Sequence, residues 1–202
     1  MNNKNKLKIM LKDIIPCIEG PYIVADGALL GLMREGDLLE FDDDIDIYIL
    51  PETKINWDKL PNNYKHHKDY MCYKIYNGED KIPHENEWLR FISYKRCCYE
   101  YLGFNRAELT SAISNDYKSE KIDRQYPDLW VDIIPLVHDN KHNLYRLPYH
   151  WSGKEFYFTP TECEGTYNNR LGFDIKIPKF SKQVLERIYG TNWIIEERDY
   201  QY

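Results

Sequence analysis

Four carboxylates within five residues form the most chemically informative part of this sequence. Residues 41–49 read Phe-Asp-Asp-Asp-Ile-Asp-Ile-Tyr-Ile, so acidic and apolar side chains alternate from Asp44 onward. Residues two apart on a strand point to the same face, which places Asp44 and Asp46 side by side and the intervening isoleucines in the core. Carboxylate oxygens suit Mg²⁺, which proteins commonly bind through one or two carboxylates together with substrate phosphates. The pattern therefore predicts a two-carboxylate clamp for a divalent cation.

The alternative for this segment is a solvated acidic turn that caps a strand, as most runs of charge are. Asp46 argues against it, because this acid lies inside an apolar strand, where an unpaired carboxylate is expensive to bury. Four neighbouring carboxylates also repel one another strongly unless a positive charge lies among them. Asp42 and Asp43 precede the strand. The side chain of Asp42 lies on the same face as that of Asp44 only if the conformation of the turn places it there.

A third acid stands alone in a second apolar segment. Residues 130–136 read Trp-Val-Asp-Ile-Ile-Pro-Leu, in which Asp132 is the single charged residue. Two interpretations are open at this point. Asp132 is either a salt-bridged acid of the core or a third metal ligand, supplied by a strand that neighbours the first.

A glycine lies upstream of the acidic run, between an expected strand and an expected helix. Residues 26–31 read Asp-Gly-Ala-Leu-Leu-Gly. Without a side chain, Gly27 lets the backbone approach a phosphate, whose charge is favoured by the N–H groups and dipole of a helix N-terminus. The same glycine also fits a tight turn that binds nothing. Arg34, near the end of that helix, either contacts phosphate or caps the helix carbonyls.

The elements that must position these residues follow from hydrophobic periodicity. Leu7, Met10, Leu11, Ile14 and Ile18 predict a helix over residues 5–19. Further helices are expected over 28–34 and 181–189, the second ending at Gly190. A long loop or insert is expected over 103–127. Strands are expected over 22–25, 45–50, 64–68, 71–76, 88–95, 129–137, 156–158 and 173–177. This order predicts an α+β fold with some α/β character, in which helices flank a mixed central sheet with inserted loops.

Length and composition narrow the class of protein. A chain of 202 residues favours one domain over 1–202. The net charge is −6, with Lys and Arg scattered among the acids, so no nucleic-acid partner is expected. The five cysteines include no C-x-x-C pair, which disfavours a disulfide framework or a Cys₄ zinc site and favours a reducing compartment.

The sequence also bears on location. The polar residues 1–8 are not followed by the apolar core of a signal peptide. No apolar run reaches roughly 18 residues, the length that spans a bilayer. We therefore expect a cytoplasmic protein without an integral membrane segment, and peripheral membrane association is left open.

Two blocks of the sequence resemble the LicD/fukutin-related phosphotransferase family, within the nucleotidyltransferase superfamily. That family's pattern runs approximately G-T-L-L-G-x-x-R and then P-W-D-D-D-I-D-I; residues 27–34 and 41–47 follow it. The resemblance continues at residues 131–136 and ends at 177–190, with an Ile-Pro-Lys and a helix that reaches Tyr-Gly. The core motifs are thus 22–50 and 129–137, followed by the helix at 181–189. Departures occur at Ala28, where the family has Thr, at Glu35, where it has His, and at Glu40-Phe41, where it has Pro-Trp.

The resemblance implies a nucleotidyltransferase-type fold and a specific chemistry. Members transfer a phosphorylated alcohol, such as phosphocholine, ribitol phosphate or glycerol phosphate, from a CDP-linked donor to a hydroxyl of a glycan, and they release CMP. The implied cofactor is Mg²⁺, with Mn²⁺ as the alternative ion, held by catalytic Asp44, Asp46 and Asp132. Asp132 is implied as metal ligand, general base or both. The implied substrate-binding residues are Gly27, Ala28, Arg34, Asp42 and Asp43.

Two other functions fit the same acids. A nucleotidyltransferase would move a nucleoside monophosphate from a triphosphate to a small molecule, a protein or RNA, and it would release pyrophosphate. A relic without catalytic activity would still bind a nucleotide or a glycan. The presence of all three acids argues against the relic.

Overall fold

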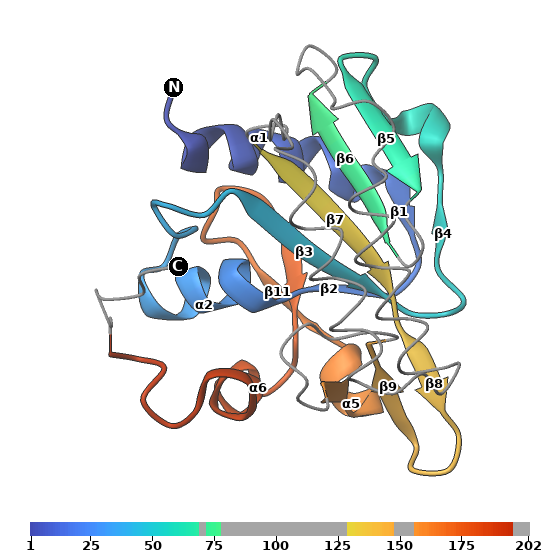
Figure 1. Cartoon of the computed structure of the whole chain (residues 1–202), viewed down its shortest axis with the longest axis vertical. Helices are drawn as coiled ribbons and strands as arrows, with labels where there is room; N and C mark the ends of the chain where they lie inside the picture. The colour runs from blue at the N-terminus through green and yellow to red at the C-terminus, as the bar shows by residue number, and fades with distance from the viewer. Residues whose placement is uncertain (69–71, 78–128, 148–155, 196–202) are drawn as a thin grey trace, which may run out of the picture.

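The structure is a computed structural model, and it describes residues 1–68, 72–77, 129–147 and 156–195. The expected strand at 88–95 and the expected insert at 103–127 lie outside these ranges. At the centre is a five-stranded sheet with the order β2-β3-β7-β6-β5 (Figure 1). Its strands are β2 (Tyr22–Val24), β3 (Asp44–Ile49), β7 (Trp130–Pro135), β6 (Tyr73–Asn77) and β5 (Tyr64–Lys68).

The sheet is mixed, as the sequence predicts. β3 and β7 are parallel, whereas every other neighbouring pair is antiparallel. All five strands overlap predicted ones, with ends that differ by at most two residues. The combination of a mixed sheet with several helices confirms the α+β class.

The first helix, α1 (Asn3–Ile14), packs on the sheet through Leu7, Met10, Leu11 and Ile14. Asn2 caps its N-terminus by accepting a hydrogen bond from the Asn5 backbone N–H at 3.1 Å. The predicted end at residue 19 is wrong. A 3₁₀ turn, η1 (Ile15–Cys17), and a short strand, β1 (Ile18–Glu19), follow the helix instead. Pro16 has no N–H with which to continue the helix, and the backbone of β1 pairs with β4 (Lys54–Ile55).

The second helix, α2 (Asp26–Arg34), connects β2 to β3 and begins two residues earlier than predicted. Gly31 lies on its buried side, against the chain that returns from the helix to β3. A Cβ atom at this position would lie 2.6 Å from the carbonyl oxygen of Asp37 and 2.8 Å from the backbone nitrogen of Leu39. The absence of a side chain at Gly31 therefore allows the returning backbone to pack directly on the helix.

Gly31→Ala is expected to lower the free energy of unfolding by about 1–3 kcal/mol, because the new methyl group meets backbone that has no rotamer by which to move away. Chemical denaturation followed by circular dichroism measures this change. Gly27→Ala is the matched control within α2, since its methyl group meets the end of a side chain. Equal loss of stability in both variants would contradict the assignment of Gly31 to backbone packing.

The C-terminal half adds small elements around the sheet. The predicted helix at 181–189 is confirmed as α6 (Ser181–Tyr189), which ends at Gly190 with a φ of +86°. The predicted strands at 156–158 and 173–177 contain β10 (Tyr157–Phe158) and β12 (Ile175–Ile177). Elements too short to be predicted are η2 (Trp57–Lys59), β8 (Val137–Asp139), β9 (Leu144–Arg146), α5 (Pro160–Cys163) and β11 (Thr166–Asn168).

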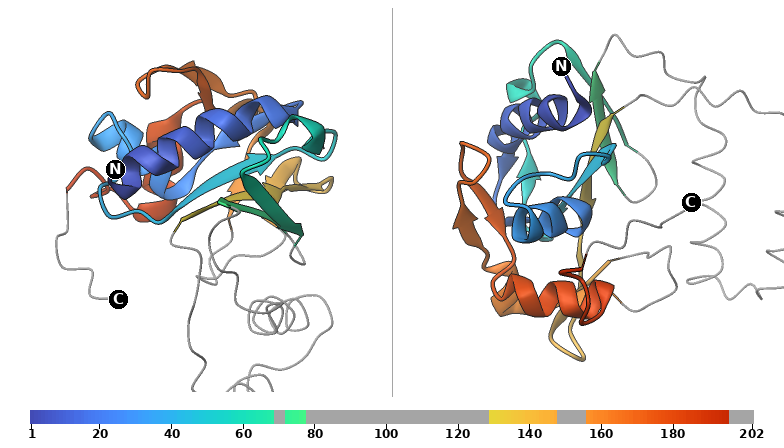
Figure 2. Two further views of the ribbon diagram at one scale, coloured as in Figure 1. Left: turned by 90° about the horizontal axis from the view of Figure 1, so that it is seen from above. Right: turned by 90° about the vertical axis from the view of Figure 1, so that its left-hand side faces the viewer.

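The two faces of the sheet differ in what covers them among the described residues. Figure 2 shows α1 and the β11–β12 hairpin on the same side of the sheet. Along β3, Ile45, Ile47 and Ile49 are buried in the core, and Asp44 and Asp46 alternate with them. Since neighbouring side chains of a strand point to opposite faces, the two acids share the opposite face. None of the described helices is long and apolar enough to cross a membrane.

Candidate metal centre

Three acids meet at the centre of the sheet, on the neighbouring strands β3 and β7. The parallel register of these strands places Asp46 directly opposite Asp132, and Asp44 lies two residues earlier on β3. Each of the three offers a carboxylate oxygen, and these oxygens all lie within 4.8 Å of one another. The sequence-based prediction named these three residues, and the structure brings them together. An all-oxygen, all-carboxylate set of this kind fits Mg²⁺ or Mn²⁺.

Burial and mutual repulsion make this acidic centre electrostatically unfavourable by itself. Burial, followed by the charges of Asp42 and Asp132, raises the pKa of Asp44 to about 7. Burial, followed by the charges of Asp26 and Asp44, raises the pKa of Asp46 well above its usual range. A divalent cation among the oxygens would relieve both effects by favouring the ionised carboxylates. The residues present therefore fit a metal site.

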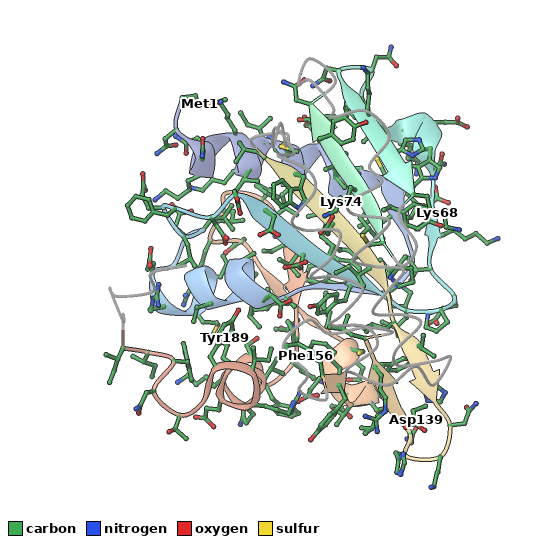
Figure 3. The ribbon with its side chains drawn as sticks, in the orientation of Figure 1. Met1, Lys68, Lys74, Asp139, Phe156 and Tyr189 are labelled. Carbon is green, nitrogen blue, oxygen red and sulfur yellow. The ribbon has the colours of Figure 1, made fainter. Side chains whose placement is uncertain are left out.

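Lys74 is part of this centre, and sequence reasoning missed it. It lies on β6, directly opposite Asp132 in the register. Its Nζ donates hydrogen bonds to Oδ1 and Oδ2 of Asp132, at 2.8 and 2.7 Å. The ammonium also lies 5.1 Å from the centre of the Trp130 ring. Figure 3 labels Lys74 over the middle of the sheet.

The Lys74–Asp132 pair bears on the question that the sequence left open. Asp132 is buried and salt-bridged, as the first interpretation expects, and its carboxylate also lies in the three-acid cluster, where the second interpretation requires it to be. Burial lowers the pKa of Lys74, but the nearby negative groups, of which Asp132 contributes most, together outweigh burial, and the net pKa is raised. The signal for Lys74 in the sequence is a single cation in an expected strand, flanked by Tyr73 and Ile75.

Asp42 and Asp43 lie in the turn before β3. Asp43 is exposed, whereas Asp42 is partly buried with its carboxylate against Gly27. Burial, then the charges of Asp43 and Asp26, raises the pKa of Asp42 to about 6. Asp42, Asp43 and Asp44 form a second group whose oxygens lie within 4.8 Å of one another. Asp44 thus belongs to both groups and links the turn to the sheet.

The backbone of α2 next to Gly27 faces this turn. A Cβ atom on Gly27 would lie 2.7 Å from Oδ2 of Asp42, so the glycine makes room for that carboxylate. The neighbouring Ala28 has its side chain buried in the core. Ala28 can therefore contact a substrate only through its backbone.

Gly27→Ala is expected to lower kcat/KM by about ten- to a hundredfold. The new methyl group displaces the carboxylate of Asp42 from its position beside the acidic centre. The loss should appear in turnover with little change in the free energy of unfolding, since a carboxylate can move where backbone cannot. Steady-state kinetics and denaturation on the same preparation measure both quantities. Unchanged kcat/KM would contradict a role for the Gly27–Asp42 contact.

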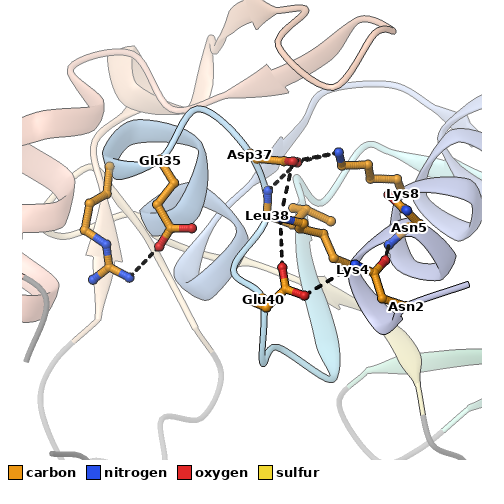
Figure 4. Close-up of polar contacts among 9 residues, drawn as sticks. Asn2, Lys4, Asn5, Lys8, Glu35, Asp37, Leu38 and Glu40 are labelled. Carbon is orange, nitrogen blue, oxygen red and sulfur yellow. Dashed lines mark hydrogen bonds and ion pairs between the residues drawn. The ribbon is translucent and has the colours of Figure 1, made fainter. Parts of the chain in front are cut away.

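Arg34 lies at the other end of α2, about 10 Å from Gly27 along the helix axis. Its Nη2 donates a hydrogen bond to Glu35 at 3.0 Å (Figure 4). The helix carbonyl of Leu32 is bonded instead by Arg170, whose Nη1 lies 2.7 Å away. The structure therefore pairs Arg34 with Glu35, and the phosphate contact implied for Arg34 stays a prediction.

Two lysines of α1 hold the loop that leads into the acidic turn. Lys8 contacts Asp37 at 2.6 Å, and Lys4 contacts Glu40 at 3.0 Å. Figure 4 shows both lysines reaching across to this loop. The amphipathic first helix therefore has two functions. Its apolar side covers the sheet, and its N-terminal lysines hold in place the loop that leads to the acids.

Asp26, the first residue of α2, is a further acid that the site prediction omitted. Burial, partly offset by a hydrogen bond from the Tyr48 hydroxyl, raises the pKa of Asp26 to about 6. Its φ of +47° is unusual for a residue other than glycine. The charge of Asp26 in turn raises the pKa of Asp46. Strained backbone next to buried charge is typical of functional sites, and the sequence signal is an acid at a strand-to-helix junction.

Comparison with models of known protein families gives a match. A family model described as "LicD/FKTN/FKRP, nucleotidyltransferase domain" matches residues 20–163. The matched part begins just before β2, ends with α5 and includes all the acids discussed above. No match is found among the curated proteins.

Proposed function

We propose a metal-dependent phosphotransferase activity for this chain, which belongs to the LicD/FKTN/FKRP nucleotidyltransferase-domain family. The general role that comes with this membership is that of a transferase in glycan modification. The specific proposal is transfer of a phosphorylated alcohol from a CDP-linked donor to a hydroxyl of a glycan, with release of CMP. The alcohol phosphate is of the phosphocholine, ribitol phosphate or glycerol phosphate type.

The observation that carries this proposal is the convergence of Asp44, Asp46 and Asp132 inside the matched segment. These acids would hold Mg²⁺, with Mn²⁺ as the alternative. When bound, the ion would neutralise charge on the donor diphosphate and on the departing CMP. Phosphoryl transfer depends mostly on positioning and charge stabilisation, and acids on two rigid, paired strands suit that requirement.

The residues of the chain have separate roles in this proposal. The strands fix the three carboxylates, and the packing of Asp42 on Gly27 fixes the turn beside them. The backbone at the N-terminus of α2 would bind a donor phosphate through its N–H groups. A carboxylate of the centre would accept the proton of the attacking hydroxyl, and Asp132 is the candidate that the sequence indicated.

Calorimetry with purified protein tests the proposal. CDP-choline, CDP-ribitol and CDP-glycerol would be titrated with and without Mg²⁺, alongside CTP, ATP, GTP and UTP. Mg²⁺-dependent binding of one CDP-alcohol, followed by CMP release with a glycan acceptor, is the expected result. Binding of a triphosphate alone, with release of pyrophosphate, would replace the proposal with a nucleotidyltransferase. Binding of none of them would leave the non-catalytic relic.

A further inference from the structure

Lys74 lies in a straight row with two of the three acids. The register of the sheet places Asp46 on β3, Asp132 on β7 and Lys74 on β6 directly beside one another. The side chains of Lys74 and Asp132 are only 19% and 12% exposed. Their contact is therefore an ion pair inside the site, and not a solvated pair at the surface.

The contact engages both oxygens of the Asp132 carboxylate, at 2.8 and 2.7 Å. An oxygen of Asp132 is also one of the three ligand atoms that lie within 4.8 Å of one another. A cation bound to the three acids and the ammonium of Lys74 therefore compete for the same carboxylate. They also repel each other, because both are positive.

A second observation indicates which kind of group the Lys74 ammonium contacts after it leaves Asp132. The indole Nε1 of Trp130 is buried and, within the described part of the chain, has no hydrogen-bond acceptor. The same indole ring lies beneath the ammonium of Lys74. A donor and a cation side by side suit an anionic oxygen, since buried donors are almost always paired. A phosphate oxygen of a diphosphate bound at the acids would satisfy both groups.

We infer that Lys74 occupies the place of the divalent cation on Asp132, and that its ammonium moves to the diphosphate of the substrate when the cation binds. The inference rests on the proposed function only in that the ligand is a diphosphate held at the acids. The movement needs rotation of a flexible four-carbon side chain, with no change in the sheet. Lys74 is thereby a substrate-binding residue, and its pairing with Asp132 keeps that one carboxylate neutralised before the cation arrives.

A fixed positioning role for Lys74 would give the opposite result in one measurement. If Lys74 only held Asp132 in place, its removal would weaken cation binding. If Lys74 competes with the cation, its removal strengthens cation binding. The sign of the change in cation affinity therefore separates the two roles.

Lys74→Met keeps the length of the side chain and removes its charge. Calorimetric titration with Mg²⁺ alone is expected to show about tenfold tighter binding than in the unaltered protein, because a like charge has been removed from the site. Titration with inorganic pyrophosphate at saturating Mg²⁺ is expected to show about tenfold weaker binding, because a charge-assisted contact is lost. Weaker Mg²⁺ binding, or unchanged pyrophosphate binding, would overturn the inference.

Two further variants complete the test. Lys68→Met is the matched control: Lys68 is exposed on the neighbouring strand β5 and contacts the Tyr73 ring, and both affinities should stay unchanged. Lys74→Arg keeps the charge if Lys74→Met does not fold. Its guanidinium binds a carboxylate through two N–H groups and competes better, so Mg²⁺ binding should weaken. Unchanged or tighter Mg²⁺ binding in Lys74→Arg would overturn the competition.

The choice of pyrophosphate keeps this test independent of the donor's identity. Pyrophosphate contains the group that a CDP-alcohol and a nucleoside triphosphate share. If no CDP-alcohol binds but pyrophosphate does, the proposed activity is wrong. The affinities for Mg²⁺ and for pyrophosphate still test the inference about Lys74.

Discussion

Asp46→Asn is expected to lower turnover by at least about a thousandfold, a loss of ~4 kcal/mol of transition-state stabilisation. Asp46 lies in the middle of β3, directly opposite Asp132, so its carboxylate is central to the three-acid cluster. An amide of the same shape keeps the packing of the strand but gives up the negative charge that holds the cation. The measurement is the rate of CMP release from the CDP-alcohol that binds.

The fold is expected to survive this substitution. Burial, followed by the charges of Asp26 and Asp44, opposes ionisation of Asp46, so a neutral amide at this position does not destabilise the cation-free protein. The thermal midpoint without Mg²⁺ should stay the same or rise. Asp58→Asn is the matched control, because Asp58 is exposed on η2, and its turnover should be unchanged. Retained activity in Asp46→Asn would refute the assignment of the metal centre.

Without a divalent cation, the free energy of unfolding is expected to fall as pH rises from about 4 to about 7. The pKa of Asp44 is raised from 3.8 to about 7, and those of Asp26 and Asp42 are each raised from 3.8 to about 6. In this window the folded protein retains protons that the unfolded chain has released. The contribution of these three acids to stability is therefore fully present below pH 4 and is lost as pH rises through 6 and 7. The expected loss is on the order of 4 kcal/mol from Asp44 alone.

Acids with lowered pKa values act in a different window. Asp139, for example, accepts hydrogen bonds from His142 and Arg146, which hold its pKa well below its usual range. Its contribution is present above the ordinary pKa of an aspartate and is lost only at lower pH. Urea denaturation at intervals between pH 4 and pH 8 therefore isolates the contribution of the acidic centre.

Saturating Mg²⁺ is expected to remove this loss at pH 7 and above, because a ligand that binds only the folded state stabilises it by mass action. Asp44→Asn should flatten the pH profile of the cation-free protein and reduce the stabilisation by Mg²⁺. Asp58→Asn serves again as the control and should retain both effects. A flat profile in the unaltered protein, or full Mg²⁺ stabilisation in Asp44→Asn, would contradict the predicted centre.

Local patterns in the sequence determined much of this protein. The alternation of Asp44 and Asp46 with isoleucines, at the start of the strand predicted over 45–50, placed two acids on one face, because strand geometry repeats every two residues. The helical spacing of Val184, Leu185 and Ile188, followed by Gly190, predicted α6 and its end. The motifs at 27–34 and 41–47 resemble the family whose model matches residues 20–163. Each of these signals lies within one short segment, so neighbouring residues are enough to read it.

Only the tertiary structure decided how these segments meet. Lys74 and Asp132 are 58 residues apart in the chain, and their pairing depends on the order and register of β6 and β7, which no local pattern specifies. The contact of Gly27 with Asp42 likewise depends on how the loop returns from α2 to β3. Burial is also a property of the whole fold, and burial is the largest cause of the raised pKa values of Asp26, Asp44 and Asp46. The sequence identified the three acids, and the assembled sheet supplied the lysine that neutralises one of them.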